Sequence, residues 1–535
     1  MPFARIAPFK TPRKVAVSQV VKMQNNPPPT GGLNLRDPIS NMAPNDAVVL
    51  NNFLPRQQGV EIRKGWRYFS SAIAGNPEIK SVFGYNAAIP ANNKIFAAAN
   101  GNIYDVTSGT PTVAVSATGS TNNQWWTCQY VTAAGVFLLA VSPGAGYWTY
   151  DSAGGWVNRT AATVGLPTNV RTVMAWKRRV WFTVTDSSTV YYMRDVDHIQ
   201  GQADPFPMGS TMNNGGYVSA LINWTVDAGT SIDDHLVVIG TEGDLSIWKG
   251  YDPTSATTFE LTGVWYIGQV PRYGTYFTAF GGDVMILSVQ GLVPLSKVIN
   301  GQWDEAALQS APASKIQTTL RPLVNEYKNS ESWDVFLLAS ESLLIIKLPA
   351  DVYGEFIQFA MNTTTGAWCT LSNVPMNCAT LLDGSLYFGL TSGRVARGFL
   401  GDKDGAASDG TGGDTIECNS QQAFNAYGTP ANLKKFQMAR PIFIATNAPS
   451  VLVQMNTQYG LEVVAGSPSF AAITGATWNG SNWNTAYWAG STNTYQAWVG
   501  INGLGYYGSL NMKVRGSPGT LYTSSHVMYE PGGVM

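Results

Sequence analysis

A unit of similar length repeats along most of this chain, and the repeat limits the possible folds more than any other feature. Each unit has a short apolar strand, a turn rich in Gly, Asp, Asn or Ser, and a second strand with aromatic residues. The apolar segments are IFAAA at 95, VFLLAV at 136, VWFTVT at 180, LVVIGT at 236, VMILSV at 284, VFLLAS at 335 and LYFGLT at 386, with starts 41, 44, 56, 48, 51 and 51 residues apart. Hairpins repeating every ~40 to 50 residues are typical of a β-propeller, whose radially packed sheets protect one another's edges.

The composition also favours β-structure. The chain has 55 Gly, 12% aromatic residues and only 13% charged residues, which suits many short strands joined by tight turns. We therefore predict an all-β fold: a β-propeller of about six or seven blades, with the apolar segments among its inner strands, a short helical insertion and an additional C-terminal β-domain. A pair of β-sandwiches is the alternative, because their hairpins have similar sequences.

Pattern changes divide the chain into five parts. They are a basic extended N-terminal arm (1–30), an anchoring segment with a short helix and a strand (31–79), the propeller (80–400), a loop (401–415), and a C-terminal β-domain or a sheet completed with the N-terminal segment (416–535). Ile316, Leu320 and Leu323 have helical spacing and predict a helical insertion near 304–330, although Pro322 limits its regularity.

The anchoring segment combines turn signals with two expected elements. APNDAVVLNNF resembles a short helix that Asn45 or Asp46 caps. GVEIRKGWRYF alternates well enough for a strand that buries Val60, Ile62 and Trp66. We therefore expect this segment to anchor part of the chain rather than to form a free end.

Charge is unevenly distributed along the chain. The formal net charge is −1, which excludes a nucleic-acid-binding polycation. No acidic residue occurs in residues 1–36, whose basic residues are Arg5, Lys10, Arg13, Lys14, Lys22 and Arg36; the rest of the chain has 27 basic and 34 acidic residues, or −7. The basic arm is either a solvated terminus or a segment that docks on an acidic neighbour. It lacks the apolar run of a secretory signal, and no segment has the ~18 apolar residues of a spanning helix, so we expect a soluble chain made in a cytosol.

Signatures of catalysis are missing from the sequence. The three histidines form no HExxH motif, and neither a GxSxG elbow nor a phosphate-binding GxxxxGK[ST] loop occurs. A glycosidase needs only two carboxylates placed in space, so this class stays open. The four cysteines show no CxxC spacing, and we expect free, mostly buried thiols.

One loop is a candidate metal site. Asp402, Asp404 and Asp409, with Asp414 beyond them, place hard oxygen ligands of the kind that Ca²⁺ prefers on a turn-rich segment. The loop departs from the EF-hand pattern, because Gly405 comes too early and no Glu closes it, so a solvated loop is the alternative. A second acidic stretch, RDVDHIQGQADP, is interpreted as turn-forming, with Asp195, Asp197 and Asp204.

Four stretches resemble the tail nozzle proteins of short-tailed bacteriophages, the tail tubular protein B type. They are GGLNLRDPISNMAPNDAVVLNNFLPRQQGVEIRKGWRYF from residue 31, SKIQTTLRPLVNEYKNSESWDVFLLASESLLIIKLP (314–349), FAMNTTTGAWCTLSNVPMNCATLLDGSLYFGLTSGRVARG (359–398) and VMYEPGG (527–533). The resemblance spans most of the chain. The chain departs from the family in its first 25 residues and in the Trp-rich region 470–500.

The resemblance implies a structural role without catalysis or cofactor. Subunits of this family form a homo-oligomeric ring, usually a hexamer, below the portal and a tail adaptor protein. Double-stranded DNA passes through the ring without specific contacts, and the ring carries tail fibres or spikes and can contact the host envelope. The expected location is the virion tail, after synthesis in the cytoplasm of the host bacterium. The alternatives are a receptor-binding or fibre-attaching virion protein and a carbohydrate-active β-propeller enzyme.

Overall fold

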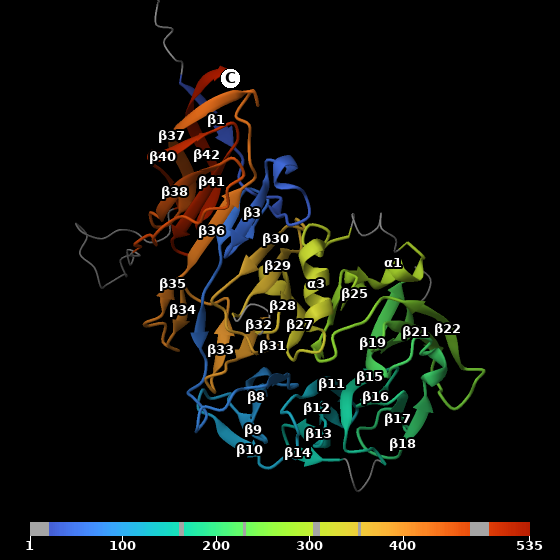
Figure 1. Ribbon diagram of the computed structural model, residues 1–535. Coiled ribbons are helices and arrows are strands. Elements are labelled where there is room, and N and C mark those ends of the chain that lie inside the picture. The colour runs from blue at the N-terminus through green and yellow to red at the C-terminus, as the bar shows by residue number, and fades with distance from the viewer. Residues whose placement is uncertain are drawn as a thin grey trace, which may run out of the picture.

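The computed structural model describes residues 21–159, 165–227, 232–302, 311–350, 355–470 and 492–534. These residues form two lobes, a ring of radially arranged sheets and a second lobe of N-terminal and C-terminal strands (Figure 1). The ring is a β-propeller, and the predicted all-β fold is confirmed. Among the described residues, neither α-helix has the length and apolarity needed to cross a membrane.

The first four blades are consecutive four-stranded antiparallel sheets. Their strands are β7 (Ser81–Tyr85), β8 (Lys94–Ala99), β9 (Asn102–Asp105) and β10 (Thr112–Val115); β11 (Trp126–Thr132), β12 (Gly135–Ser142), β13 (Gly146–Asp151) and β14 (Gly155–Asn158); β15 (Val170–Trp176), β16 (Arg179–Val184), β17 (Thr189–Met193) and β18 (Ala203–Pro207); and β19 (Val218–Asp227), β20 (Ile232–Gly240), β21 (Asp244–Gly250) and β22 (Phe259–Tyr266).

A three-stranded sheet and two further four-stranded blades complete the ring. Their strands are β24 (Phe277–Phe280), β25 (Asp283–Ser288) and β26 (Gly291–Pro294); β27 (Trp333–Leu338), β28 (Leu343–Lys347), β29 (Gln358–Asn362) and β30 (Trp368–Leu371); and β31 (Cys378–Leu382), β32 (Ser385–Gly389), β33 (Val395–Gly398) and the N-terminal β6 (Trp66–Tyr68). The short β23 (Gly274–Thr275) pairs with β27. Six sheets of the ring thus have at least four strands each in the described chain, which confirms the prediction of six or seven blades.

The apolar repeat segments were predicted to be inner strands, and their position within the blades needs correction. Only VFLLAS belongs to an innermost strand, β27, while the other six are the second strands β8, β12, β16, β20, β25 and β32. Second strands are sandwiched between neighbouring blades on both faces, so β8 and β12 are almost entirely buried. Innermost strands such as β11 and β24 are largely half-buried and carry a weaker apolar signal.

The second lobe contains two packed sheets that mix both ends of the chain. One sheet contains β1 (Lys22–Asn26), β4 (Phe53–Pro55), β5 (Val60–Ile62), β37 (Asn432–Ala445), β39 (Asn493–Gln496), β40 (Val499–Gly505) and β42 (Leu521–Val534). The other contains β2 (Gly32–Leu33), β3 (Asp46–Asn51), β36 (Glu417–Gln422), β38 (Ser450–Thr457) and β41 (Gly508–Arg515). This second sheet continues into the propeller, because Asn51 pairs with Thr370 of β30.

The predicted helix in APNDAVVLNNF is wrong, since these residues form strands β3 and β4. Strand β3 is held by β2 and β30 in parallel and by β36 in antiparallel pairing. The β-branched Val48 and Val49 suit this sheet better than a helix. Tertiary pairing with strands far along the chain therefore overrides the local cap signal.

The predicted strand GVEIRKGWRYF is divided between the two lobes. Val60 and Ile62 lie in β5 of the second lobe and Trp66 in β6 of the propeller. All three side chains are buried, as expected. The segment between β5 and β6 therefore crosses from one lobe to the other.

Two α-helices occur in the described residues, α1 (Leu295–Ile299) and α3 (Gln317–Tyr327). Helix α3 lies in the predicted helical insertion and contains Pro322, and its apolar face, with Ile316 just before it, packs into the main core. Residues 303–310 of that insertion lie outside the described residues. Short 3₁₀ turns are η1 (Ile39–Asn41), η2 (Pro90–Asn92), η3 (Gly209–Thr211) and η4 (Ala339–Glu341).

The segment 401–415, expected to be a loop, contains the hairpin β34 (Lys403–Ala406) and β35 (Asp414–Thr415). Strand β34 pairs in parallel with β6, and so extends the last blade. This pairing needs a strand from the other end of the chain, which the loop-like composition does not reveal.

Candidate functional site

The crossing between β5 and β6 centres on a buried arginine. Arg63 is 1% exposed, and its guanidinium donates to both carboxylate oxygens of Asp404 at 2.8 and 2.6 Å. It also donates to Asn52 Oδ1 at 2.8 Å, to the Lys64 carbonyl at 3.0 Å and to the Ser372 carbonyl at 2.8 Å. Burial raises the pKa of Asp404, and the hydrogen bonds from Arg63 oppose that rise. The paired, fully bonded guanidinium therefore links the anchoring segment, blade β27–β30 and the hairpin β34–β35.

Asn52 shapes the backbone beside Arg63. It lies between β3 and β4 with φ 59°, in the left-handed region that Asn adopts more readily than most residues. Its amide nitrogen donates to the Ser372 hydroxyl at 3.1 Å and to the Glu417 carbonyl at 2.8 Å, and its backbone N–H donates to Thr370 O at 2.8 Å. Asn52 therefore connects the propeller to the first strand of the C-terminal part.

A second, partly buried cluster connects the opening of the anchoring segment to the helical insertion. Lys315 Nζ lies 2.6 Å from Asp46 Oδ1 and donates to the Gly31 carbonyl at 2.8 Å. Asn34, which is fully buried, donates to the other oxygen of Asp46 at 2.7 Å. The backbone N–H of Leu35 donates to Lys315 O at 2.8 Å. Asp46, expected to cap a helix, instead neutralises Lys315 across 269 residues of sequence.

Close backbone packing completes the crossing. A Cβ on Gly65 would lie 2.0 Å from the Lys403 carbonyl oxygen, so β6 can approach β34 only with glycine there. The indole of Trp66 donates to Asn373 O at 2.7 Å and packs edge-on against Phe388. We name the two clusters and this packing the interlock, defined by Asn34, Asp46, Asn52, Arg63, Gly65, Trp66, Lys315 and Asp404.

The proposed calcium ligands occupy different environments. Asp404 is bound to Arg63, whereas Asp409 is exposed and accepts from the N–H and hydroxyl of Thr411 at 2.9 and 2.7 Å. Asp402 is half-buried, and Asp414 is exposed on β35. Within the described ranges, no three His, Cys, Asp or Glu side chains are grouped to hold a metal ion.

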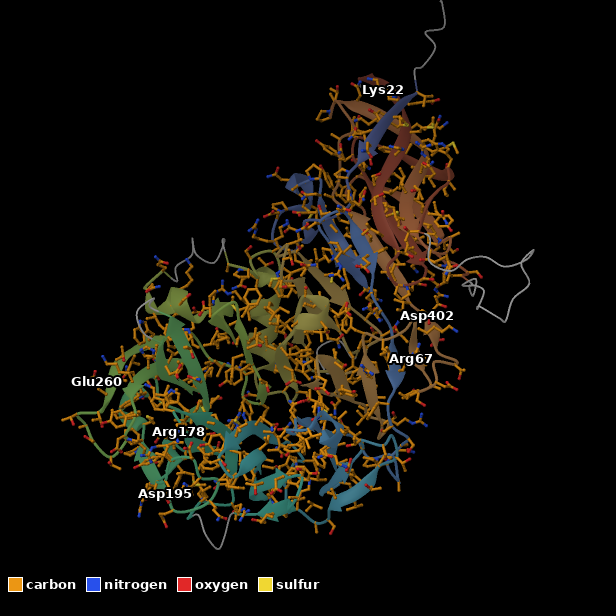
Figure 2. The ribbon with its side chains drawn as sticks, turned by 180° about the vertical axis from the view of Figure 1, so that it is seen from behind. Lys22, Arg67, Arg178, Asp195, Glu260 and Asp402 are labelled. Atoms are coloured by element: carbon orange, nitrogen blue, oxygen red, sulfur yellow. The ribbon has the colours of Figure 1, made fainter. Side chains whose placement is uncertain are left out.

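The second acidic stretch lies in another part of the molecule. Figure 2 shows Asp195 and Arg178 in the propeller, far from Asp402 and Arg67, which lie toward the second lobe. Asp197, with φ 59°, pairs with Arg178, and Asp204 pairs with Arg194 at 2.6 Å. Asp197 and Asp204 therefore form local ion pairs around a turn.

The histidines do not lie together. His198 is in an exposed turn, His235 is on β20 and His526 is on β42, where its Nδ1 lies 2.8 Å from Arg440 Nη2. The cysteines are free thiols, and Cys369, Cys378 and Cys418 are buried. Trp478, Trp483 and Trp488 of the Trp-rich region, and most of the basic arm, lie outside the described residues.

Sequence reasoning identified the anchoring segment but missed Arg63, Asn52 and Lys315. The detectable signals were a charged residue inside the apolar alternation of VEIRKGW, and two adjacent Asn residues before a strand. Neither signal identifies a partner, because Arg63 and Asp404 are 341 residues apart.

Comparison with known proteins identifies no family. No family model matches the chain, and no curated protein matches it. The β-propeller domain of Myceliophteria thermophila Cps50 (Swd1) is 12% identical over 63% of this chain and 100% of its own, with a TM-score of 0.39. The WD40 β-propeller domain of Doa1 is 9% identical (62% and 96% covered, TM-score 0.34), and BamB from Moraxella catarrhalis is 10% identical (71% and 98%, TM-score 0.32).

Proposed function

We propose that this chain is a structural subunit of the tail of a short-tailed phage. In this proposal about six copies form the distal nozzle ring, through which double-stranded DNA leaves the capsid and to which the adaptor and tail appendages attach. The sequence resemblance suggests this role. The interlock is the structural observation that supports it best.

The interlock matters because it holds the two lobes together through the anchoring segment, which contains one of the stretches of resemblance. A ring subunit that conducts DNA must keep its lobes in register while neighbouring subunits and DNA press on it. Charge pairs with a buried carboxylate fix one geometry, because a shifted register leaves Arg63 or Lys315 without its carboxylate. Strand β3 of the second lobe also pairs with β30 of the propeller through Asn51 and Thr370, so separating the lobes requires breaking this sheet pairing as well.

A closed ring requires two different, complementary faces on each subunit, and a two-lobed subunit offers such faces. The modest net charge of −1 suits a conduit, since a wall dense in Lys and Arg would hold phosphates by counterion release. In the described part of the chain, the interlock carboxylates Asp46 and Asp404 are bound to cations rather than facing a cleft as a free catalytic pair. These features favour a structural role over glycan cleavage.

The proposal is tested by measuring the position and the copy number of this chain in particles of the phage that encodes it. Antibodies against the propeller, viewed by electron microscopy, should label one axial ring at the distal end of the tail, and quantitative mass spectrometry should give about six copies per particle. Labelling of peripheral fibres would refute the proposal in favour of a receptor-binding protein. Cleavage of host glycans by the purified chain would instead support an enzyme.

A further inference from the structure

A pocket of about 290 Å³ lies where the innermost strands of the propeller begin. Its wall combines the starts of β7, β11, β15, β27 and β31 with the segment around β23. It is therefore at one mouth of the central channel, where several blades can contribute side chains to one ligand. The interlock residues do not line it.

Most charged groups of this pocket have partners of opposite charge. Lys80 lies 3.1 Å from Glu78 and 3.4 Å from Glu331. Arg272 lies 2.9 Å from Asp186. Asp334 lies 3.8 Å from Lys347 and accepts the Thr275 N–H at 3.3 Å. In each of these pairs, the two opposite charges neutralise each other.

Arg171 is the exception among the pocket's described charges. It is the second residue of the innermost strand β15, and its guanidinium lies 5.6 Å from the centre of the Tyr273 ring. It forms no ion pair and donates no side-chain hydrogen bond within the described residues, and burial lowers the pKa of its guanidinium. Arg171 is half-buried, and a partly desolvated guanidinium without an anion is stabilised by a ligand that supplies the negative charge.

A second guanidinium lies beside the same ring. Arg272 is 5.8 Å from the Tyr273 ring centre and 5.4 Å from that of Tyr217. Tyr273 therefore has two arginines close to it, of which Asp186 neutralises one. Guanidinium groups bind phosphate and carboxylate oxygens through paired N–H donors, and two guanidiniums beside one ring favour a doubly charged anion.

We propose that this pocket binds a small oxyanion of the phosphate or phosphate-monoester class, with Arg171 as its main ligand and Arg272 as a supporting one. The pocket volume accommodates a phosphate group with a small organic substituent. Two sources share this chemistry, a free small molecule and a phosphate of DNA.

The experiment uses the purified full-length chain with inorganic phosphate as the probe. Thermal unfolding is followed in rising phosphate and in NaCl of equal ionic strength, and affinity is measured by calorimetry. Phosphate should raise the melting temperature beyond the NaCl control, because a ligand that binds the native state stabilises it. Arg171→Met should weaken phosphate binding by roughly tenfold or more. Arg194→Gln, which removes an exposed charge from the same blade, should leave binding unchanged.

Several outcomes are decisive. Without phosphate, R171M should melt no lower than the wild type, because the lost cation had no carboxylate partner. If R171M does not fold, Arg171→Lys serves instead and should bind phosphate more weakly, since lysine keeps the charge but lacks the paired donors. The proposal is overturned if phosphate and NaCl act alike on the wild type, if the arginine variants bind phosphate as the wild type does, or if a short DNA duplex binds at Arg171 and phosphate does not.

Discussion

Replacing Asp404 with Asn should destabilise the protein strongly, although the two side chains have nearly the same shape. Two of the five hydrogen bonds of the Arg63 guanidinium end on this carboxylate, and Arg63 is 1% exposed, so water cannot replace them. Asn keeps one acceptor oxygen and turns an NH₂ group toward the cation. Hydrogen bonds to charged groups contribute about 1.5 to 3 kcal/mol each, and breaking a buried pair costs about 3 to 5 kcal/mol. We expect the free energy of unfolding to fall by about 3 to 5 kcal/mol.

Denaturant unfolding provides the assay for D404N. Because a two-lobed chain can unfold in steps, tryptophan fluorescence is combined with limited proteolysis near residues 401–415. The control is Asp409→Asn, an exposed carboxylate five residues away, with an expected effect within about 0.5 kcal/mol. The double variant R63M/D404L should recover much of the loss, since it buries no unpaired charge. The reasoning is refuted if D404N and D409N unfold at the same denaturant concentration.

Three further predictions concern the core, the thiols and the arm. Leu138→Asp should prevent soluble folding, because Leu138 is 1% exposed and the substitution buries a charge. Leu337→Asp should be tolerated better, because Leu337 is half-buried. Equal melting curves for L138D and the wild type would contradict the blade assignment. Burial raises the pKa of Cys369 and Cys378 to about 12, so at pH 8 roughly one of these thiols in ten thousand is ionised. A disulfide reagent should therefore label Cys369 and Cys378 only after the protein unfolds. Deleting residues 1–20 removes four basic residues but keeps β1, so the melting temperature should stay unchanged. Weak, salt-sensitive binding to duplex DNA should be lost. Tight or salt-insensitive binding of DNA by the truncated chain would contradict a passive conduit.

The propeller could be predicted from the sequence because its signal is local. Each blade places a strand such as β12 between two neighbours, and burial of both faces produces an apolar run that the sequence repeats. The innermost position could not be assigned, because strands that face the channel, such as β11, mix exposed and buried residues. The repeat therefore gives the period of the blades but not which strand lies innermost.

The interlock could be predicted only as a segment with an anchoring role. Val60, Ile62 and Trp66 follow an alternation that correctly predicts burial. Arg63 and Lys64 carry the same charge next to each other, yet Arg63 is buried and Lys64 is half exposed, with 49% of its side chain accessible. Only the location of Asp404, at the opposite end of the chain, distinguishes them.

The pairing of distant segments also determines when this fold can be completed. Blade β31–β33 gains its fourth strand from β6, and β3 lies between β30 and β36, so the anchoring segment has partners that are synthesised more than 300 residues later. Loop closure over such distances is slow, and unpaired strand edges are exposed until it occurs. The pairs Arg63–Asp404 and Lys315–Asp46, whose carboxylates are both buried, would be unfavourable with only one partner in place. They therefore stabilise the two-lobed subunit only when both lobes have closed, so that partly closed chains lack this stabilisation.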